Sequence, residues 1–131
     1  MSLNSFNFNT TPGIRYGSGQ AKDSCKEIFD KLGSRILFIT DKGLMSLGLT
    51  KSTIDELKKM SEVEVFEDVE ADPSKATLVK AIEIGKKFKA TGVIGFGGGS
   101  SMDVAKLSAL ILGSNEDLEK AWGVANAKGP R

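Results

Sequence analysis

The feature that most constrains this chain is the alternation of short apolar runs with segments of helical periodicity. Residues 35–40 form a nearly continuous apolar run, residues 63–69 alternate valine with glutamate, and residues 93–96 form another short apolar run. Such runs are typical of β-strands, and the first is typical of a strand buried on both faces. The segments between and after them place apolar residues at helical spacing. This order predicts an α/β fold, a doubly wound, mostly parallel, Rossmann-like sheet with helices on both faces and right-handed crossovers.

Cap and stop signals predict where the helices begin and end. The predicted helices span 20–32, 49–60, 72–90 and 100–112, with shorter helical pieces at 44–48 and 118–122. Gly33 ends the first helix, Thr50 caps the second, and Asp72 caps the third with Pro73 in its first turn. The segment Phe6–Tyr16 is expected to be extended or to form a pair of short strands.

Length and composition favour one ordinary domain and argue against several partners. The chain has 131 residues, 40% of them hydrophobic, with 18 basic and 17 acidic side chains and a net charge of +1. A nearly neutral chain gives no reason to expect a nucleic acid or an anionic membrane as partner. No stretch is apolar enough for a membrane helix, and residues 1–9 do not look like a signal peptide. The single cysteine, Cys25, excludes a disulfide within the chain, so a cytoplasmic location is expected.

The chain contains no histidine. With one cysteine and no histidine, an ordinary zinc or non-haem iron site cannot be built, and Ser–His and Cys–His nucleophile pairs are excluded. Acid–base work would fall to aspartate, glutamate, lysine or Tyr16. These absences indicate a binding domain rather than a complete active site.

The segment Gly95–Lys106 carries the clearest chemical signal. A short apolar strand leads into glycines 97–99, and a helix begins at once. Glycines allow a ligand close to the backbone, and a helix N-terminus offers free N–H groups to a phosphate. Ser100 or Ser101 can cap this helix, with Asp103 placed as in a capping box. The alternative is a tight strand-to-helix turn, because the string matches neither G-x-G-x-x-G nor the NTPase phosphate loop.

Two other positions are candidates for cofactor contacts. Asp41 ends the first apolar strand, where an acidic group can accept hydrogen bonds from an adenosine ribose and repel a 2′-phosphate. It can equally be a solvated turn residue. Gly17-Ser18-Gly19 matches part of the dinucleotide fingerprint, with Asp41 about 20 residues further on, but Lys22 replaces the third glycine. We therefore interpret Gly17 and Gly19 as a turn. Lys106 either lies on the surface near Asp103 or faces the cofactor.

The segment from Gly97 to Lys106 resembles the signature of the iron-containing alcohol dehydrogenases, G-G-G-S-x-x-D-x-A-K, at every fixed position. Further similar segments are Phe8, Pro12, Ile14–Gly19, Ile39–Lys42 and Asp72–Ser74, although many members carry Asn where Asp72 stands. The resemblance extends from about Phe6 to Pro130. It implies that Asp41 meets the adenosine ribose of NAD, that Gly97, Gly98, Gly99 and Ser100 hold the pyrophosphate, and that Asp103 and Lys106 lie toward the nicotinamide.

The resemblance also implies how the chain relates to a whole enzyme. Residues 1–131 would be the N-terminal dinucleotide-binding domain, and an all-helical C-terminal domain would hold Fe²⁺ or Zn²⁺ through an aspartate and histidines. The chain is then expected to be a fragment without catalytic or metal-binding residues and inactive alone. The parent would interconvert an alcohol and an aldehyde or ketone, and exposed apolar surface predicts association as a homodimer.

Two alternatives remain open at this point. The chain could be a stand-alone nucleotide-binding or regulatory module that never had a metal domain, which would also explain the missing histidines. Alternatively, the parent could be a glycerol or polyol dehydrogenase of the same superfamily, because related enzymes share the alanine-lysine end of the signature.

Overall fold

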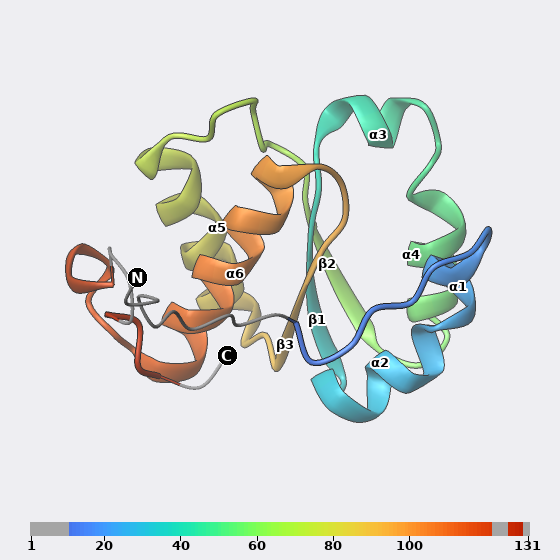
Figure 1. Cartoon of the computed structure of the whole chain (residues 1–131), viewed down its shortest axis with the longest axis horizontal. Coiled ribbons are helices and arrows are strands. Elements are labelled where there is room, and N and C mark those ends of the chain that lie inside the picture. Colours follow the sequence, from blue (N-terminus) through green and yellow to red (C-terminus); the bar gives the residue numbers. More distant parts are fainter. Residues whose placement is uncertain (1–10, 122–125, 130–131) are drawn as a thin grey trace, which may run out of the picture.

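The structure is a computed structural model and describes residues 11–121 and 126–129. In chain order the elements are α1 (Gln20–Asp23), α2 (Cys25–Leu32), β1 (Arg35–Ile39), α3 (Lys42–Ser46), α4 (Lys51–Leu57), β2 (Glu62–Phe66), α5 (Lys75–Phe88), β3 (Gly92–Gly95), α6 (Gly99–Ser114) and the 3-10 helix η1 (Leu118–Lys120). The predicted α/β class and the alternation of strands with helices are confirmed (Figure 1).

The three strands form a parallel sheet in the order β2-β1-β3. β1 takes the centre, with Ile36 opposite Val63 on β2 and opposite Gly92 on β3. All of residues 36–39 are buried, as expected for a continuous apolar run between two neighbours. The central strand therefore carries most of the sheet's contribution to the core.

The two outer strands differ from the centre in burial. β2 exposes its glutamates and half-buries Val63 and Val65, which confirms the predicted edge strand. β3 is the other outer strand among the described residues, and Val93 and Ile94 are only half-buried. The apolar run at residues 93–96 thus supplies a strand, but a half-buried one where burial was expected, because no described strand pairs with the outer side of β3.

Helices cover both faces of the sheet. Figure 1 shows α5 and α6 on one side and α1, α2 and α4 on the other. Side chains along β1 point alternately to the two faces of the sheet. Leu37 and Ile39 pack with α5 and α6, whereas Ile36 and Phe38 pack with the helices on the opposite face. The opposite layer contains the buried thiol of Cys25.

The cap predicted for α5 is wrong by two residues. Ser74, in an extended conformation, is the N-cap, and its hydroxyl accepts a hydrogen bond from the Thr77 N–H at 3.2 Å. Asp72 instead adopts a left-handed conformation with φ 54°. Aspartate tolerates that conformation better than most residues, so Asp72 turns the chain and leaves the capping to Ser74.

Other local expectations are partly met. Gly33 ends α2 with φ 76° as predicted, but the first helical segment is split at Ser24 into α1 and α2. Thr50 precedes α4 as predicted, yet its hydroxyl donates to the sulfur of Met45 rather than capping the helix. Residues 11–16 form no strand, which leaves the first of the two expectations for this segment, an extended chain. Residues 6–10 lie outside the described part.

The described residues also bear on membrane insertion. Within 11–121 and 126–129, no helix combines the length and the apolarity needed to cross a membrane.

Candidate cofactor-binding site

The loops that follow the three strands meet at one edge of the sheet. Asp41 follows β1, residues 67–74 follow β2, and Gly97 begins the loop after β3, all at the upper edge in Figure 1. In doubly wound sheets ligands bind outside this carboxyl edge, where neighbouring connections diverge to opposite faces. Here the connection from β1 enters α3 and α4, and the connection from β3 enters α6 on the other side of the sheet (Figure 1).

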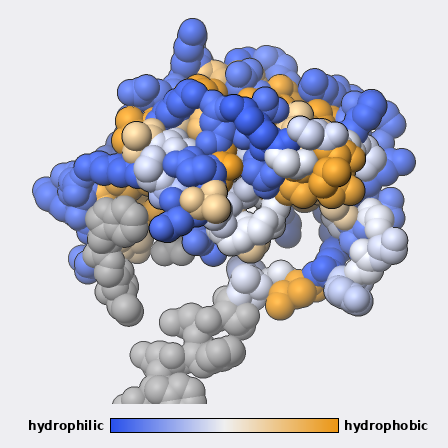
Figure 2. All heavy atoms as spheres, turned by 90° about the horizontal axis from the view of Figure 1, so that it is seen from above, coloured by the Kyte–Doolittle hydropathy of each residue, from blue (hydrophilic) through white to orange (hydrophobic). Residues whose placement is uncertain are grey.

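A cavity of about 400 Å³ lies at this edge. Its lining residues come from all three loops: Asp41, Lys42, Gly43, Val69, Glu70, Ala71, Gly98, Gly99, Ser100 and Ser101. Figure 2 looks down on the edge, where hydrophilic surface predominates and an apolar cluster lies on the side of α3 and α4. The sequence placed Asp41, Gly98, Gly99 and Ser100 at one site, and the structure brings these four residues to one cavity.

The glycine loop leaves open space on the cavity side. A side chain at Gly98 or Gly99 would meet nothing within 4 Å, so each could carry one without disturbing the fold. Gly97 differs, because its φ is 145° and an added Cβ would lie 3.0 Å from the Ser101 hydroxyl and 3.1 Å from Leu44. The fold itself therefore requires glycine at 97, whereas glycine at 98 and 99 keeps the cavity open.

The N-terminus of α6 faces this open space without a side-chain cap. Gly98 is the N-cap, and within the described residues no side chain accepts a hydrogen bond from the helix start. The first amide bonded within the helix is that of Met102, so the N–H groups of residues 99–101 lack helical acceptors. The predicted cap at Ser100 or Ser101 is wrong, because the glycine before them occupies the cap position.

Asp103 and Lys106 lie apart from the first cavity. Their side chains are 68% and 71% exposed and pair with each other at 3.3 Å, so the predicted capping box does not form. Lys106 lines a separate hollow of about 280 Å³ along β3, with Val93, Gly95 and Met102 among its walls. Along α6, Asp103 lies about one helical turn after Gly99, and Lys106 about two.

Gly95 allows α6 to approach β3 closely. An added Cβ there would lie 2.7 Å from the Cβ of Ala105 and 3.2 Å from the backbone of Met102. The helix start is thus held against the strand end at a fixed distance. Close packing at this point determines where the free amides of α6 lie.

Asp41 has a structural role as well as a place in the cavity. It is the N-cap of α3, and its Oδ1 accepts a hydrogen bond from the Leu44 N–H at 2.9 Å. Its backbone forms an antiparallel bridge with Asp68 of the next loop. Asp41 is half-buried and lines the same cavity as the start of α6.

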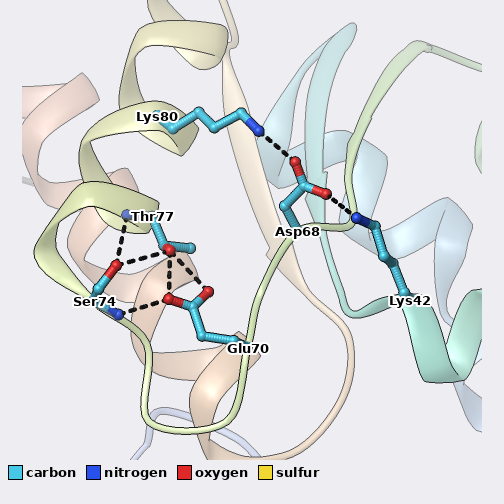
Figure 3. A network of polar contacts seen from close by, with 6 residues as sticks. All are labelled: Lys42, Asp68, Glu70, Ser74, Thr77 and Lys80. Carbon is cyan, nitrogen blue, oxygen red and sulfur yellow. Dashed lines mark hydrogen bonds and ion pairs between the residues drawn. The ribbon is translucent and has the colours of Figure 1, made fainter.

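A polar network after β2, shown in Figure 3, was not predicted from the sequence. The carboxylate of Asp68 accepts hydrogen bonds from Lys42, at 2.7 Å, and from Lys80. The hydrogen bonds and charges of the two lysines lower the pKa of Asp68 to about 2. Asp68 thereby joins the start of α3 to α5 across the end of β2.

Glu70 forms the second half of this network. Its carboxylate accepts hydrogen bonds from the Ser74 N–H at 3.0 Å and from the Thr77 hydroxyl at 2.6 Å (Figure 3). The Ser74 amide first, and then the Thr77 hydroxyl, lower the pKa of Glu70 to about 2. Glu70 therefore stays ionised while it lines the cavity. No local sequence pattern indicated Glu70, because its partners lie four and seven residues further on, at the start of α5.

The described residues do not fit a metal centre. Within 11–121 and 126–129 no group of three or more histidine, cysteine, aspartate or glutamate side chains could hold a metal ion. Asp41, Asp68 and Glu70 are each engaged in hydrogen bonds with protein N–H or O–H donors. The site that this edge does offer is one for an anionic or polyhydroxyl ligand.

A parallel α/β sheet with an uncapped helix N-terminus at its carboxyl edge is an arrangement that Rossmann-like folds use to bind phosphate-containing ligands. Comparison with known proteins identifies the branch. The family model for iron-containing alcohol dehydrogenase matches residues 11–130. The chain belongs to the iron-containing alcohol dehydrogenase family, as the signature predicted.

Individual relatives agree with this assignment. The chain is 28% identical over 116 residues to a sulfoacetaldehyde reductase from Bilophila wadsworthia, covering 88% of this chain and 30% of the relative. The NADH-dependent butanol dehydrogenase A from Thermotoga maritima superposes with a TM-score of 0.79 at 27% identity, covering 92% of this chain and 32% of that one.

A third relative was solved with a bound dinucleotide. The sulfoacetaldehyde reductase from Bifidobacterium kashiwanohense, in complex with NAD⁺, superposes with a TM-score of 0.75 at 27% identity, covering 94% of this chain and 32% of that one. The chain thus spans about a third of the length of the relatives it matches. The NAD cofactor predicted from the signature agrees with the descriptions of the Thermotoga and Bifidobacterium proteins.

Proposed function

We propose that this chain binds NAD(H), with the pyrophosphate at the N-terminus of α6. The observation that carries the proposal is the cavity bounded by Gly98, Gly99 and the uncapped amides of residues 99–101. Free N–H groups and the helix dipole favour a phosphate there, and the missing side chains let it come close. The predicted pyrophosphate residues Gly97, Gly98, Gly99 and Ser100 all belong to this loop and helix start.

Asp41 is the proposed partner of the adenosine ribose. It lines the same cavity as Gly98 and Gly99, and its Oδ1 accepts a hydrogen bond from the Leu44 N–H. The carboxylate keeps further acceptor capacity for ribose hydroxyls, because an ionised carboxylate offers about four lone-pair sites. The same charge opposes a 2′-phosphate, so NADH should bind better than NADPH.

Asp103 and Lys106 are proposed to lie toward the nicotinamide. The dinucleotide would run from Asp41, across the start of α6, into the hollow along β3 that Lys106 lines. This path uses both hollows that border the first turns of α6. No residue of the chain is assigned a catalytic role.

The proposed activity of the whole protein is the interconversion of an alcohol with an aldehyde or ketone. In the oxidation, the C–H bond of the alcohol carbon breaks and its hydride adds to the nicotinamide of NAD⁺. The hydroxyl proton leaves, and the products are a carbonyl compound, NADH and H⁺. The family is iron-containing, but the described residues include no group of side chains that could hold the metal.

Oligomeric state and location are part of the same proposal. Ile14 and Tyr16 are 81% and 101% exposed, and β3 has no described partner on its outer side, so we expect a homodimer. A buried free thiol at Cys25 fits a reducing, cytoplasmic compartment. Light scattering tests the first expectation, and a clean monomer would contradict it.

The experiment that tests the function is a titration of the purified chain with NADH and NADPH, followed by nicotinamide fluorescence. We expect NADH to bind more tightly than NADPH and Asp41→Ala to lose that preference. The variant also lacks the α3 cap, so its melting temperature is measured beside its binding. If a folded wild-type chain binds neither dinucleotide, the proposal is wrong for this chain.

A further inference from the structure

A second cavity, of about 510 Å³, adjoins the proposed cofactor site. Its polar walls are Lys42, Glu67, Asp68, Glu70, Thr77 and Lys80, and Phe66 and Val69 are among its apolar ones. The two lysines approach Asp68 from different elements, Lys42 from α3 and Lys80 from α5, as Figure 3 shows. Two cations from separate elements therefore converge on one carboxylate.

The two cavities are neighbours at the proposed ribose end and share part of their walls. Lys42, Val69 and Glu70 line both of them. The backbone bridge between Asp41 and Asp68 places the ribose-facing residue beside the residue that holds the lysines. A phosphate on a ribose hydroxyl at Asp41 would consequently lie next to the cavity in which Lys42 and Lys80 converge.

Lys42 and Lys80 are the two cations of a cavity that Glu67, Asp68 and Glu70 also line, and Asp68 is the carboxylate that pairs with both of them. Lys42 and Lys80 are 69% and 58% exposed, so their ammonium groups can be reached from solvent. Asp68 is 35% exposed and sits between them, where it satisfies both. Two lysine ammonium groups within reach of one another are a common arrangement for binding phosphate, and a carboxylate fixed between them takes the place of that ligand.

We propose that Asp68 is an internal anion that occupies a two-lysine phosphate site, and that it thereby sets the cofactor preference against the 2′-phosphate of NADP(H). This inference rests on the proposed function, since it assumes that the ribose lies at Asp41. Lys42 and Lys80 would bind the 2′-phosphate of NADP(H) if Asp68 were uncharged, and in the wild-type chain they bind Asp68 instead. Asp41 and Asp68 would disfavour NADP(H) in different ways. Asp41 would repel the 2′-phosphate at the ribose, and Asp68 would keep Lys42 and Lys80 from binding it.

The test is Asp68→Asn, which keeps the shape of the side chain and removes its charge. We expect the affinity for NADPH to rise about tenfold, as one charge-assisted hydrogen bond would give. Affinity for NADH should change less than about twofold, since it lacks the added phosphate. In calorimetric titrations, the affinity for adenosine 2′,5′-bisphosphate should rise in Asp68→Asn as it does for NADPH, whereas the affinity for adenosine 5′-monophosphate should not.

Two further variants make the result specific. Asp55→Asn changes the net charge equally, but Asp55 pairs with Lys51 on α4, on the other side of the sheet, so NADPH binding should stay at the wild-type level. Adding Lys80→Met to Asp68→Asn should abolish the gain. Asp68→Ser replaces Asp68→Asn if the latter fails to fold by circular dichroism.

The outcomes separate this inference from the function beneath it. If the wild type binds NADH and Asp68→Asn leaves the NADPH affinity unchanged, the inference is overturned and the proposed function stands. An equal gain in Asp55→Asn would also overturn it, because net charge would then explain the effect. If the wild-type chain binds no dinucleotide, the proposed function and the inference fall together.

Discussion

The chain contains two glycine-rich segments that precede helices, and only one of them lies at the sheet. Gly17-Ser18-Gly19 forms a turn in an exposed segment and leads into α1, which has no buried residue. The glycines 97–99 lie one residue after β3 and open α6, a helix of 16 residues with six of them buried. Both segments allow unusual backbone conformations, but only the second lies beside a cavity lined by several loops.

The difference lies in what each glycine does. Gly19 has φ 79°, and only Asp23 comes within 4 Å of an added Cβ, so glycine serves the backbone conformation there. Gly98 has φ −78°, which suits any residue, and an added Cβ would project into open space. A glycine that the backbone does not require is a better sign of a ligand site than one that it does.

The largest effect is expected for Gly98→Asn. Asparagine is a good N-cap, so it should accept hydrogen bonds from the α6 amides and fill the open space. We expect helix stability to rise by a few tenths of a kcal/mol while NADH affinity falls about a hundredfold. Fluorescence titration and thermal melting measure the two properties. If the folded variant binds NADH with unchanged affinity, the glycine loop does not contact the cofactor.

A second prediction concerns the contact that positions α6. Gly95→Ala brings a Cβ to within 2.7 Å of Ala105, so strand and helix must separate. We expect a loss of about 1–3 kcal/mol in the free energy of unfolding, as for other overpacked contacts. Urea unfolding measures it. A variant as stable as the wild type would mean that α6 is not held closely against β3.

The matched change in the first glycine segment is Gly19→Ala. An alanine with positive φ costs about 1 kcal/mol, so stability should fall slightly. Binding of NADH should stay within about twofold of wild type, since this turn is remote from the carboxyl edge. Lost NADH affinity with intact stability would place the cofactor at the first segment and reverse the comparison.

The smallest effect is a dependence of stability on acid. Asp68 and Glu70 have pKa values lowered to about 2 in the folded chain. Groups with depressed pKa values stabilise the fold above their unfolded values, near pH 4, and lose that contribution as the pH falls toward 2. Thermal melts between pH 6 and pH 2 should therefore show falling stability below pH 4, less steeply in Asp68→Asn. An identical slope in the variant would contradict the role of Asp68.

Much of the fold could be predicted because its signals are local. The apolar run of β1 and the periodicity of α5 each lie within one segment, and the sequence predicted both. The cap of α5 was misplaced because Asp72-Pro73 and Ser74 are both plausible starts, and only the path of the chain after β2 decides between them.

The candidate site was predictable only in part, because only some of its residues are marked by local signals. The glycine loop and Asp41 are marked by their positions after strands, so the sequence identified them. Asp68 and Glu70 were missed, because their partners Lys42, Lys80 and Thr77 come from elements whose relative placement depends on tertiary packing. The separation of Lys106 from the first cavity likewise depends on the rotation of α6 against β3.

The central claim is that a phosphate of the dinucleotide binds at the second glycine segment. It is tested most directly by recording amide ¹H–¹⁵N chemical shifts of the labelled chain during a titration with NADH. We predict saturable shifts at Gly98, Gly99, Ser100 and Ser101, with Gly17 and Gly19 unchanged in the same spectra. Shifts confined to Gly17 and Gly19, or none at the start of α6 despite binding, would contradict the claim.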